Sequence, residues 1–178
     1  FIGVINALGG GVIRDILLGI FPPIMFTYKV YAIVSIVSSL FVFLFAYNDT
    51  DRFLGNLENI DNFVNIFDAI GLGIFSVTSI QRCINFGYVD NAFLCILMSM
   101  TTGIGGGIMR DLLCQKLPAV LRKRIYALAA IAGGTIYYYM FKLNINHSLA
   151  MFCGMISTFI IRLLATKYKW NMPRIKKQ

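Results

Sequence analysis

The chain has 178 residues, of which 58% are hydrophobic and 13% charged, and its formal net charge at pH 7 is +8. A soluble domain is normally about half apolar and about a quarter charged, so this composition excludes an ordinary soluble protein and indicates a membrane protein. The basic residues flank apolar segments and form no stripe on a polar element, which favours contact with membrane lipid and argues against nucleic-acid binding.

A helix of about 20 apolar residues crosses the roughly 30 Å hydrocarbon core of a membrane. Six segments of this chain are apolar over about that length. They are Phe1–Leu18, Tyr28–Tyr47, Asn62–Arg82, Asn91–Leu113, Ile125–Phe141 and Ser148–Thr166. The first begins at residue 1 with neither a charged flank nor an initiator Met, so we expect that the chain starts, or has been cut, inside a hydrophobic helix. The longest polar connection, residues 48–61, divides the chain into two halves.

Each half contains one copy of the same unusual string. Gly9-Gly10-Gly11-Val12-Ile13-Arg14-Asp15 recurs 96 residues later as Gly105-Gly106-Gly107-Ile108-Met109-Arg110-Asp111. Pro22 recurs at the same offset as Pro118, and after a slip of one residue Lys29-Val30-Tyr31-Ala32 aligns with Arg124-Ile125-Tyr126-Ala127. These matches indicate an internal duplication.

The duplication predicts an inverted repeat. A helix, Asn62–Arg82, precedes the second copy, so by symmetry the first half should also have one before Phe1. Three helices are an odd number, so the second repeat enters the membrane from the opposite side, as in many transporters and some channels. The predicted fold is an all-α membrane protein with a first repeat (1–47, without its first helix), a polar loop (48–61), a second repeat (62–141), a final spanning helix (148–166) and a basic tail (167–178).

The distribution of basic residues predicts the orientation. If the loop after Leu113 is cytoplasmic, ten Lys and Arg residues fall on the cytoplasmic side and three on the other. This bias follows the positive-inside rule, so the C-terminus and the tail 167–178 are predicted to be cytoplasmic.

The glycine triplets are the first candidate site. Three consecutive glycines cost about 3 kcal/mol of helix propensity relative to alanine. We therefore expect each triplet to interrupt its helix with a kink or an unwound turn, whose freed carbonyls and amides face a water-filled path. Close packing of two helices is the alternative. The candidate path residues are Gly9, Gly10, Gly11, Gly105, Gly106 and Gly107.

Charged residues inside apolar segments are the second candidate site. Neighbours on a helix project about 100° apart, so Arg14 and Asp15, like Arg110 and Asp111, are expected to reach other helices rather than each other. In an inverted repeat one pair lies toward each membrane face, where it would gate a polar path. The alternative for Arg110 is that it extends to the lipid headgroups.

Asp68 is the strongest single outlier, because it lies about two turns inside the segment Asn62–Arg82. An isolated carboxylate there costs a few kcal/mol unless it is paired or hydrated. We expect it on an ion path, with Arg14 or Arg110 as its partner. A purely structural ion pair is the alternative.

The sequence contains no pattern typical of an enzyme, such as a Ser-His-Asp set, HExxH or a Walker loop. The four cysteines (Cys83, Cys95, Cys114, Cys153) form no CxxC pair, and the single histidine, His147, has no partner for a metal. We therefore expect neither catalysis nor a cofactor or bound metal.

Together, the doubled Gly-Gly-Gly-x-x-Arg-Asp, the proline after each copy and the run Phe67-Asp68-Ala69-Ile70-Gly71-Leu72 resemble one family. It is the prokaryotic branch of the trimeric intracellular cation (TRIC) channels, also described as membrane proteins with two glycine-transporter domains. The resemblance implies a seven-helix subunit of two inverted three-helix repeats and a final helix, Ser148–Thr166. It also implies a homotrimer with a pore in each subunit, shaped by glycine kinks at Gly9–Gly11 and Gly105–Gly107.

Two departures from the family limit what the resemblance implies. The first of the seven helices is missing, and the Lys-Glu-Val motif of animal members does not occur, so their lipid-linked gating is not carried over. The leading hypothesis is a channel for monovalent cations, K⁺ and Na⁺, in the bacterial inner (plasma) membrane. The alternatives are a secondary transporter of glycine or another small amino acid, and a purely structural membrane protein.

Overall fold

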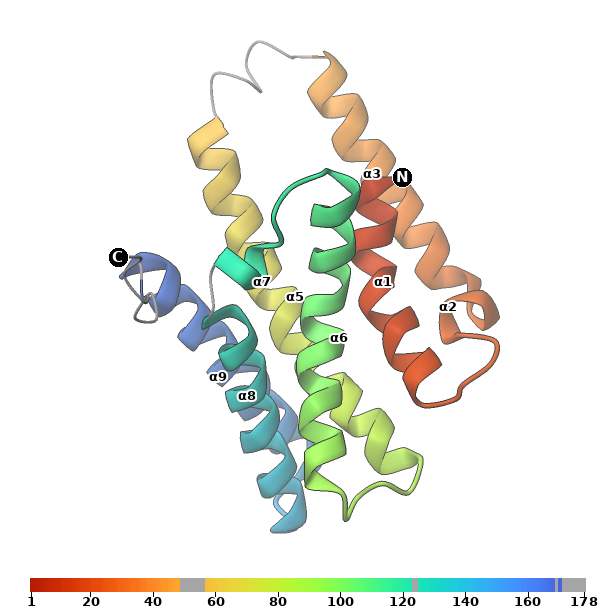
Figure 1. The fold of residues 1–178 in the computed structure, drawn as a ribbon, viewed down its shortest axis with the longest axis vertical. Coiled ribbons are helices and arrows are strands. Elements are labelled where there is room, and N and C mark those ends of the chain that lie inside the picture. Colours follow the sequence, from red (N-terminus) through yellow and green to blue (C-terminus); the bar gives the residue numbers. More distant parts are fainter. Residues whose placement is uncertain (49–56, 123–124, 169, 171–178) are drawn as a thin grey trace, which may run out of the picture.

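The computed structural model describes residues 1–48, 57–122, 125–168 and 170, and these residues form helices and no strand. The elements in chain order are α1 (Ile2–Leu17), α2 (Ile24–Thr27), α3 (Lys29–Asn48), α5 (Leu57–Asn85), α6 (Ala92–Leu113), α7 (Ala119–Arg122), α8 (Ile125–Lys142) and α9 (His147–Lys167). The predicted all-α fold is confirmed (Figure 1).

The long helices follow the six predicted segments, with one clear difference. Helix α5 begins at Leu57, five residues before the predicted Asn62, so the end of the predicted polar loop 48–61 is helical. Among the described residues, four helices are long and apolar enough to cross a membrane: α3, residues 64–85 of α5, α6 and α9. Helix α1 has only 16 residues. Helix α8 has 18 residues and includes three consecutive tyrosines (137–139) and Lys142.

The short helices α2 and α7 were not predicted. Each directly follows a proline: Pro23, the neighbour of the duplicated Pro22, precedes Ile24, and Pro118 precedes Ala119. The fixed φ of proline suits the entry into a helix, and its missing N–H would be unpaired there in any case. The two halves therefore each have a short helix in the segment that connects their two long helices.

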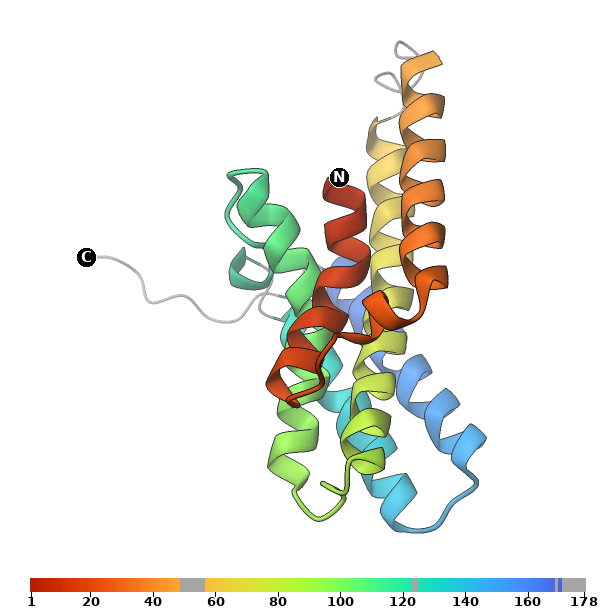
Figure 2. The same cartoon turned by 90° about the vertical axis from the view of Figure 1, so that its right-hand side faces the viewer.

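The two halves run in opposite directions. Helix α1 descends in Figure 1 and α6 ascends, whereas α3 ascends and α8 descends. Figure 2, turned by 90°, shows the same opposition of α1 and α6. The predicted inversion of the second repeat is therefore present in the backbone.

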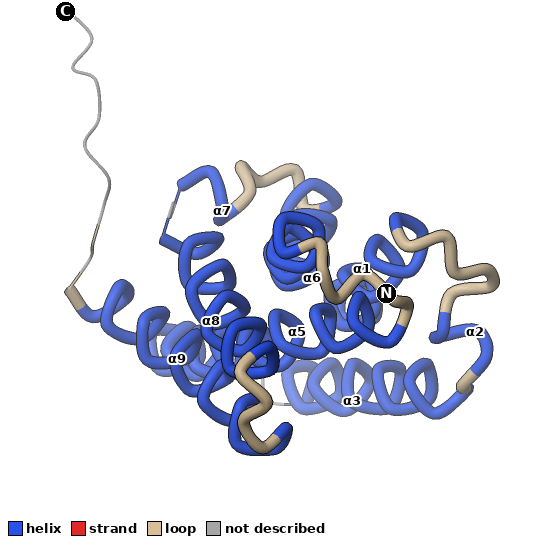
Figure 3. The backbone as a smooth tube through the Cα atoms, turned by 90° about the horizontal axis from the view of Figure 1, so that it is seen from below, coloured by secondary structure: helices blue, strands red, loops and turns tan. Residues whose placement is uncertain are grey.

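The apolar core lies within the second half and the final helix. Its largest cluster joins residues of α5, α6, α8 and α9, namely Val77, Ile80, Cys83, Cys95, Met98, Tyr137, Tyr138 and Ala150. Helix α1 packs on α6, and α3 packs on α1 at the edge of the bundle, on the opposite side from α9 (Figure 3). Only 6% of the spanning part of α3 is buried, against 28–39% for the other three candidate spans.

Candidate functional site

The glycine triplets lie inside continuous helices. Helix α1 runs without interruption through Gly9–Gly11, and α6 runs through Gly105–Gly107. The expected unwound turn is therefore wrong. An unpaired backbone group in hydrocarbon costs several kcal/mol, whereas glycine costs about 1 kcal/mol of helix propensity per residue, so the helical hydrogen bonds prevail.

The first two glycines of each triplet form a close crossing between α1 and α6. An added Cβ at Gly10 would overlap the carbonyl oxygen of Thr102, and one at Gly106 would overlap that of Asn6. Asn6 and Thr102 are themselves 96 residues apart, so the crossing has the approximate twofold symmetry of the repeat. Close packing, the alternative reading of the glycines, accounts for Gly9, Gly10, Gly105 and Gly106, which are all buried.

The third glycine of each triplet has different surroundings. A Cβ at Gly11 would meet only Arg14 Nη2, at 3.9 Å. A Cβ at Gly107 would meet Arg110 Nη2 at 3.9 Å and Tyr126 Oη at 3.7 Å. Both glycines therefore face polar side chains, and not the opposite triplet.

Each arginine of the duplicated string binds the aspartate beside it. Arg14 donates from Nε and Nη2 to Asp15 Oδ1 at 2.8 and 2.7 Å, and the corresponding Arg110 contacts with Asp111 Oδ1 are both 2.9 Å. The expectation that neighbours cannot pair is wrong, because the long arginine side chain bends across the 100° between adjacent positions.

The two Arg–Asp pairs lie at the ends of α1 and α6, toward opposite ends of the bundle (Figure 1). The Arg14 and Asp15 side chains are 10% and 2% exposed, whereas those of Arg110 and Asp111 are 28% and 9% exposed. Asp15 also accepts a hydrogen bond from the backbone N–H of Ile24, at the start of α2, at 2.9 Å. The first pair is therefore the more deeply buried.

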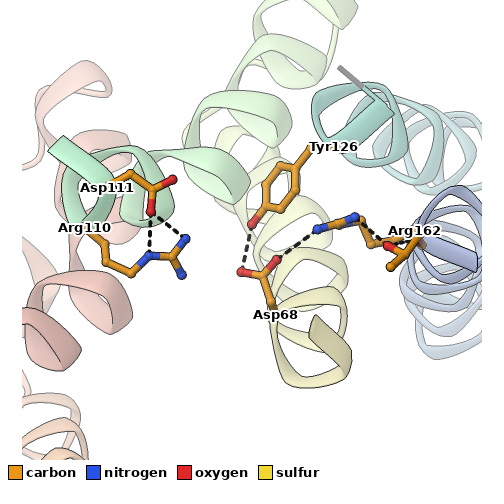
Figure 4. A network of polar contacts seen from close by, with 6 residues as sticks. Asp68, Arg110, Asp111, Tyr126 and Arg162 are labelled. Carbon is orange, nitrogen blue, oxygen red and sulfur yellow. Dashed lines mark hydrogen bonds and ion pairs between the residues drawn. The ribbon is translucent and has the colours of Figure 1, made fainter. Parts of the chain in front are cut away.

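Asp68 on α5 lies in a network with α8 and α9 (Figure 4). Tyr126 Oη donates to Asp68 Oδ1 at 3.0 Å, and Arg162 Nη2 lies 3.6 Å from Asp68 Oδ2. The expected partners, Arg14 and Arg110, were wrong. In Figure 4 the Arg110–Asp111 pair lies on the other side of Asp68 from Arg162.

Arg162 is the functional candidate that sequence reasoning missed. Its signal was present, since it is a cation inside the apolar segment Ser148–Thr166. The side chain is 4% exposed, its guanidinium carbon lies 4.5 Å from the centre of the Tyr126 ring, and Nη1 donates to Thr166 Oγ1 at 2.8 Å. The network thus brings together side chains of α5, α8 and α9.

Two buried side-chain atoms lack a hydrogen-bond partner in the described part of the chain. They are Arg162 Nε, beside Asp68, and Thr102 Oγ1, at the crossing of α1 and α6. Buried polar groups are normally paired, so each is a place where a bound water molecule would be favourable.

Metal-binding geometry is not found among the described side chains, where no group of three or more His, Cys, Asp or Glu converges. The four cysteines are free thiols. Among the described residues, the polar network around Asp68 is therefore our candidate functional site.

Known sequences align with nearly the whole of this chain. The family model described as "Glycine transporter" matches residues 1–47 and 65–142. A UPF0126 membrane protein of Vibrio cholerae is 32% identical over 169 residues, which are 95% of this chain and 67% of the relative. The UPF0126 inner membrane protein YadS of Escherichia coli is 31% identical over 175 residues, 97% of this chain and 79% of the relative.

Solved structures of TRIC channels share the fold. One comes from work on the structural basis of conductance through TRIC cation channels and has a TM-score of 0.85 and 31% sequence identity. The match covers 98% of this chain and 81% of the chain in that structure. A prokaryotic TRIC channel crystallised in 0.5 M KCl has a TM-score of 0.82 and 34% identity, with 95% and 81% covered. The orthologue from Rhodobacter sphaeroides has a TM-score of 0.79 and 29% identity, with 93% and 80% covered.

Proposed function

This chain belongs to the TRIC channel family, whose domain model is the one described as "Glycine transporter", and from that premise we propose that it is a channel for monovalent cations, K⁺ and Na⁺, in a bacterial inner membrane. The observation that carries the proposal is Asp68. It is a carboxylate inside a spanning helix, its side chain is 19% exposed, and its ion pair is long. Such a group attracts cations into a low-dielectric path.

The proposed path runs beside α6 in each subunit. Gly107, Tyr126 and Asp68 are consecutive neighbours along it, since Tyr126 Oη contacts Asp68 and lies next to the open side of Gly107. The unpartnered Thr102 hydroxyl lies further along the same helix. In this proposal Gly11 and Gly107 leave room for the path, while Gly9, Gly10, Gly105 and Gly106 fasten the two repeats together.

The Arg–Asp pairs are proposed as closures at the two ends of this path. Arg14–Asp15 and Arg110–Asp111 lie toward opposite ends of the bundle, and each arginine lies beside the third glycine of its own triplet. A cation that passes either pair meets a guanidinium first, so opening requires the arginine to turn away from the path.

The assembly and the orientation are also proposals. The related structures are named as trimeric channels, which supports a homotrimer with one pore in each subunit. The family match at 1–47 and 65–142 supports repeats at 1–47 and 62–141. The excess of Lys and Arg around the loop after Leu113 supports a cytoplasmic C-terminus, which accessibility of a C-terminal cysteine tag to an impermeant maleimide in intact cells would test.

Ion flux in liposomes tests the proposed function. The full-length protein should carry K⁺ at a rate that does not saturate at low millimolar concentration, and Asp68→Asn should reduce this flux. Flux no greater than in empty vesicles would contradict the proposal.

The description of the matching family model supports one other candidate, a transporter of glycine. Counterflow of labelled glycine that saturates and is blocked by unlabelled glycine would select this function. A channel gives no such counterflow, so the two assays separate the candidates.

A further inference from the structure

Arg162 belongs to neither repeat, yet among the described residues it is the cation that pairs with Asp68. It lies on α9, after the end of the second repeat, and its guanidinium enters the bundle beneath the Tyr126 ring. Its Nη2 lies 3.6 Å from Asp68 Oδ2, and its side chain is almost completely buried. The guanidinium therefore lies where a cation attracted by Asp68 would lie.

The geometry of this ion pair is loose. A guanidinium usually binds a carboxylate through two N–H groups at about 2.7–2.9 Å. Arg14 binds Asp15 in that distance range through Nε and Nη2, whereas Arg162 approaches Asp68 through Nη2 alone, at 3.6 Å. Its Nε is buried without a partner among the described residues. A pair that serves only to stabilise the fold would be expected to close both contacts.

A weak contact between Arg162 and Asp68 would allow another cation to displace the guanidinium. Asp68 also accepts a hydrogen bond from Tyr126 Oη at 3.0 Å, which holds the carboxylate in place when the arginine moves. Arg162 keeps a separate contact along its own helix with Thr166, which holds the guanidinium near the carboxylate after it separates. Each member of the pair therefore has a hydrogen bond that does not involve the other member.

We propose that Arg162 is a tethered cation, which occupies the position of a permeant ion at Asp68 and thereby sets the charge selectivity of the path. This inference rests on the proposed channel function. With Arg162 in place the site is nearly neutral, and an entering K⁺ must displace the guanidinium. Without it, the unbalanced carboxylate favours cations over anions.

Reversal potentials of reconstituted full-length channels in a KCl gradient test this assignment. Arg162→Ala should raise the K⁺ to Cl⁻ permeability ratio by roughly threefold or more, and Asp68→Asn should lower it by a similar factor, because each leaves one charge unbalanced. The double variant, which lacks both charges, should return toward the wild-type ratio.

A free guanidinium ion provides the second readout. The space left by Arg162→Ala should admit it, so millimolar guanidinium chloride should reverse the change in selectivity. The D68N/R162A double variant should not respond, because it lacks the carboxylate that would hold the ion. A merely structural arginine predicts no such rescue.

The matched control removes a positive charge from another ion pair. Lys142 contacts Asp90 at 2.6 Å at the exposed end of α8, so Lys142→Met should leave the permeability ratio unchanged. Arg162→Gln keeps part of the side-chain stem beneath Tyr126 and serves for the selectivity measurement if Arg162→Ala does not assemble.

The outcomes separate the two proposals. Absence of K⁺ current in the wild type would overturn the channel function itself. Conduction by the wild type with an unchanged permeability ratio in the Arg162 variant would overturn the role of Arg162 alone. A change in Lys142→Met as large as that in the Arg162 variant would also overturn it.

Discussion

The two copies of the Gly-Gly-Gly-x-x-Arg-Asp string have the same contacts where they cross and different contacts beyond the crossing. Gly10 and Gly106 each face a backbone carbonyl of the other helix, at positions related by the repeat. Past the crossing, the first string ends in a buried, two-pronged Arg14–Asp15 pair. The second ends in a more exposed pair, near the network of Asp68, Tyr126 and Arg162.

This difference separates the structural part of the motif from the part available for function. Contacts that both halves share fix how the repeats pack. In this chain Tyr126 is buried and bonded to Asp68, whereas Tyr31, which aligns with it in the first half, is exposed.

We expect the largest difference in stability between the two halves when the arginines of the Arg–Asp pairs are replaced. Arg14→Gln should lower the free energy of unfolding by about 3–5 kcal/mol, because it leaves Asp15 buried without its ion-pair partner. Arg110→Gln should have a smaller effect, since its pair is more exposed. Unfolding of the purified protein in mixed micelles by increasing SDS measures both. Equal losses would show that the difference in burial has no energetic consequence.

Within each glycine triplet, we expect the substitutions to have different effects on stability. Gly10→Ala and Gly106→Ala place a methyl group against a backbone oxygen that cannot rotate away, and should each destabilise the protein by about 1–3 kcal/mol. Gly11→Ala and Gly107→Ala meet nothing closer than 3.7 Å and should be neutral or slightly stabilising. Melting temperatures in detergent distinguish the two groups. A triplet in which all three positions are equally sensitive would contradict the assigned crossing.

The smallest effect is expected from the tyrosines. Tyr126→Phe removes the hydrogen bond to Asp68 and should lower stability by about 1 kcal/mol. Tyr31→Phe is the matched control at the equivalent position and should have no measurable effect, since its side chain is exposed. The comparison uses the same melting assay, and the K⁺ flux of Tyr126→Phe should also change. A larger loss for Tyr31→Phe would reverse the proposed asymmetry.

Much of the fold followed from local sequence patterns. Six apolar segments predicted the six long helices within a few residues, except at the start of α5. The polar residues that precede Asn62 suggested a loop there, but helix α5 already includes residues 57–61. The short helices α2 and α7 carried no hydrophobic period of their own, so composition did not reveal them.

The candidate site was only partly predictable. Asp68 was identified because a carboxylate in an apolar helix is costly wherever the other helices lie. Its partner was not identified, since Arg162 is 94 residues away in sequence and meets Asp68 only through the packing of α9 against α5. The Arg–Asp contacts and the continuity of the glycine helices were predicted wrongly, because both depend on what surrounds those residues.

The sequence by itself determined the membrane setting, the six long helices and the inversion of the two halves. Hydropathy, helical period and duplication are properties of the chain read locally, so they require no knowledge of contacts. Only the tertiary structure decided that the glycines close a crossing and do not break a helix, and that Arg162 is the partner of Asp68. The physical reason is that backbone pairing in hydrocarbon and the reach of long side chains are set by neighbouring helices, whose positions no local pattern specifies.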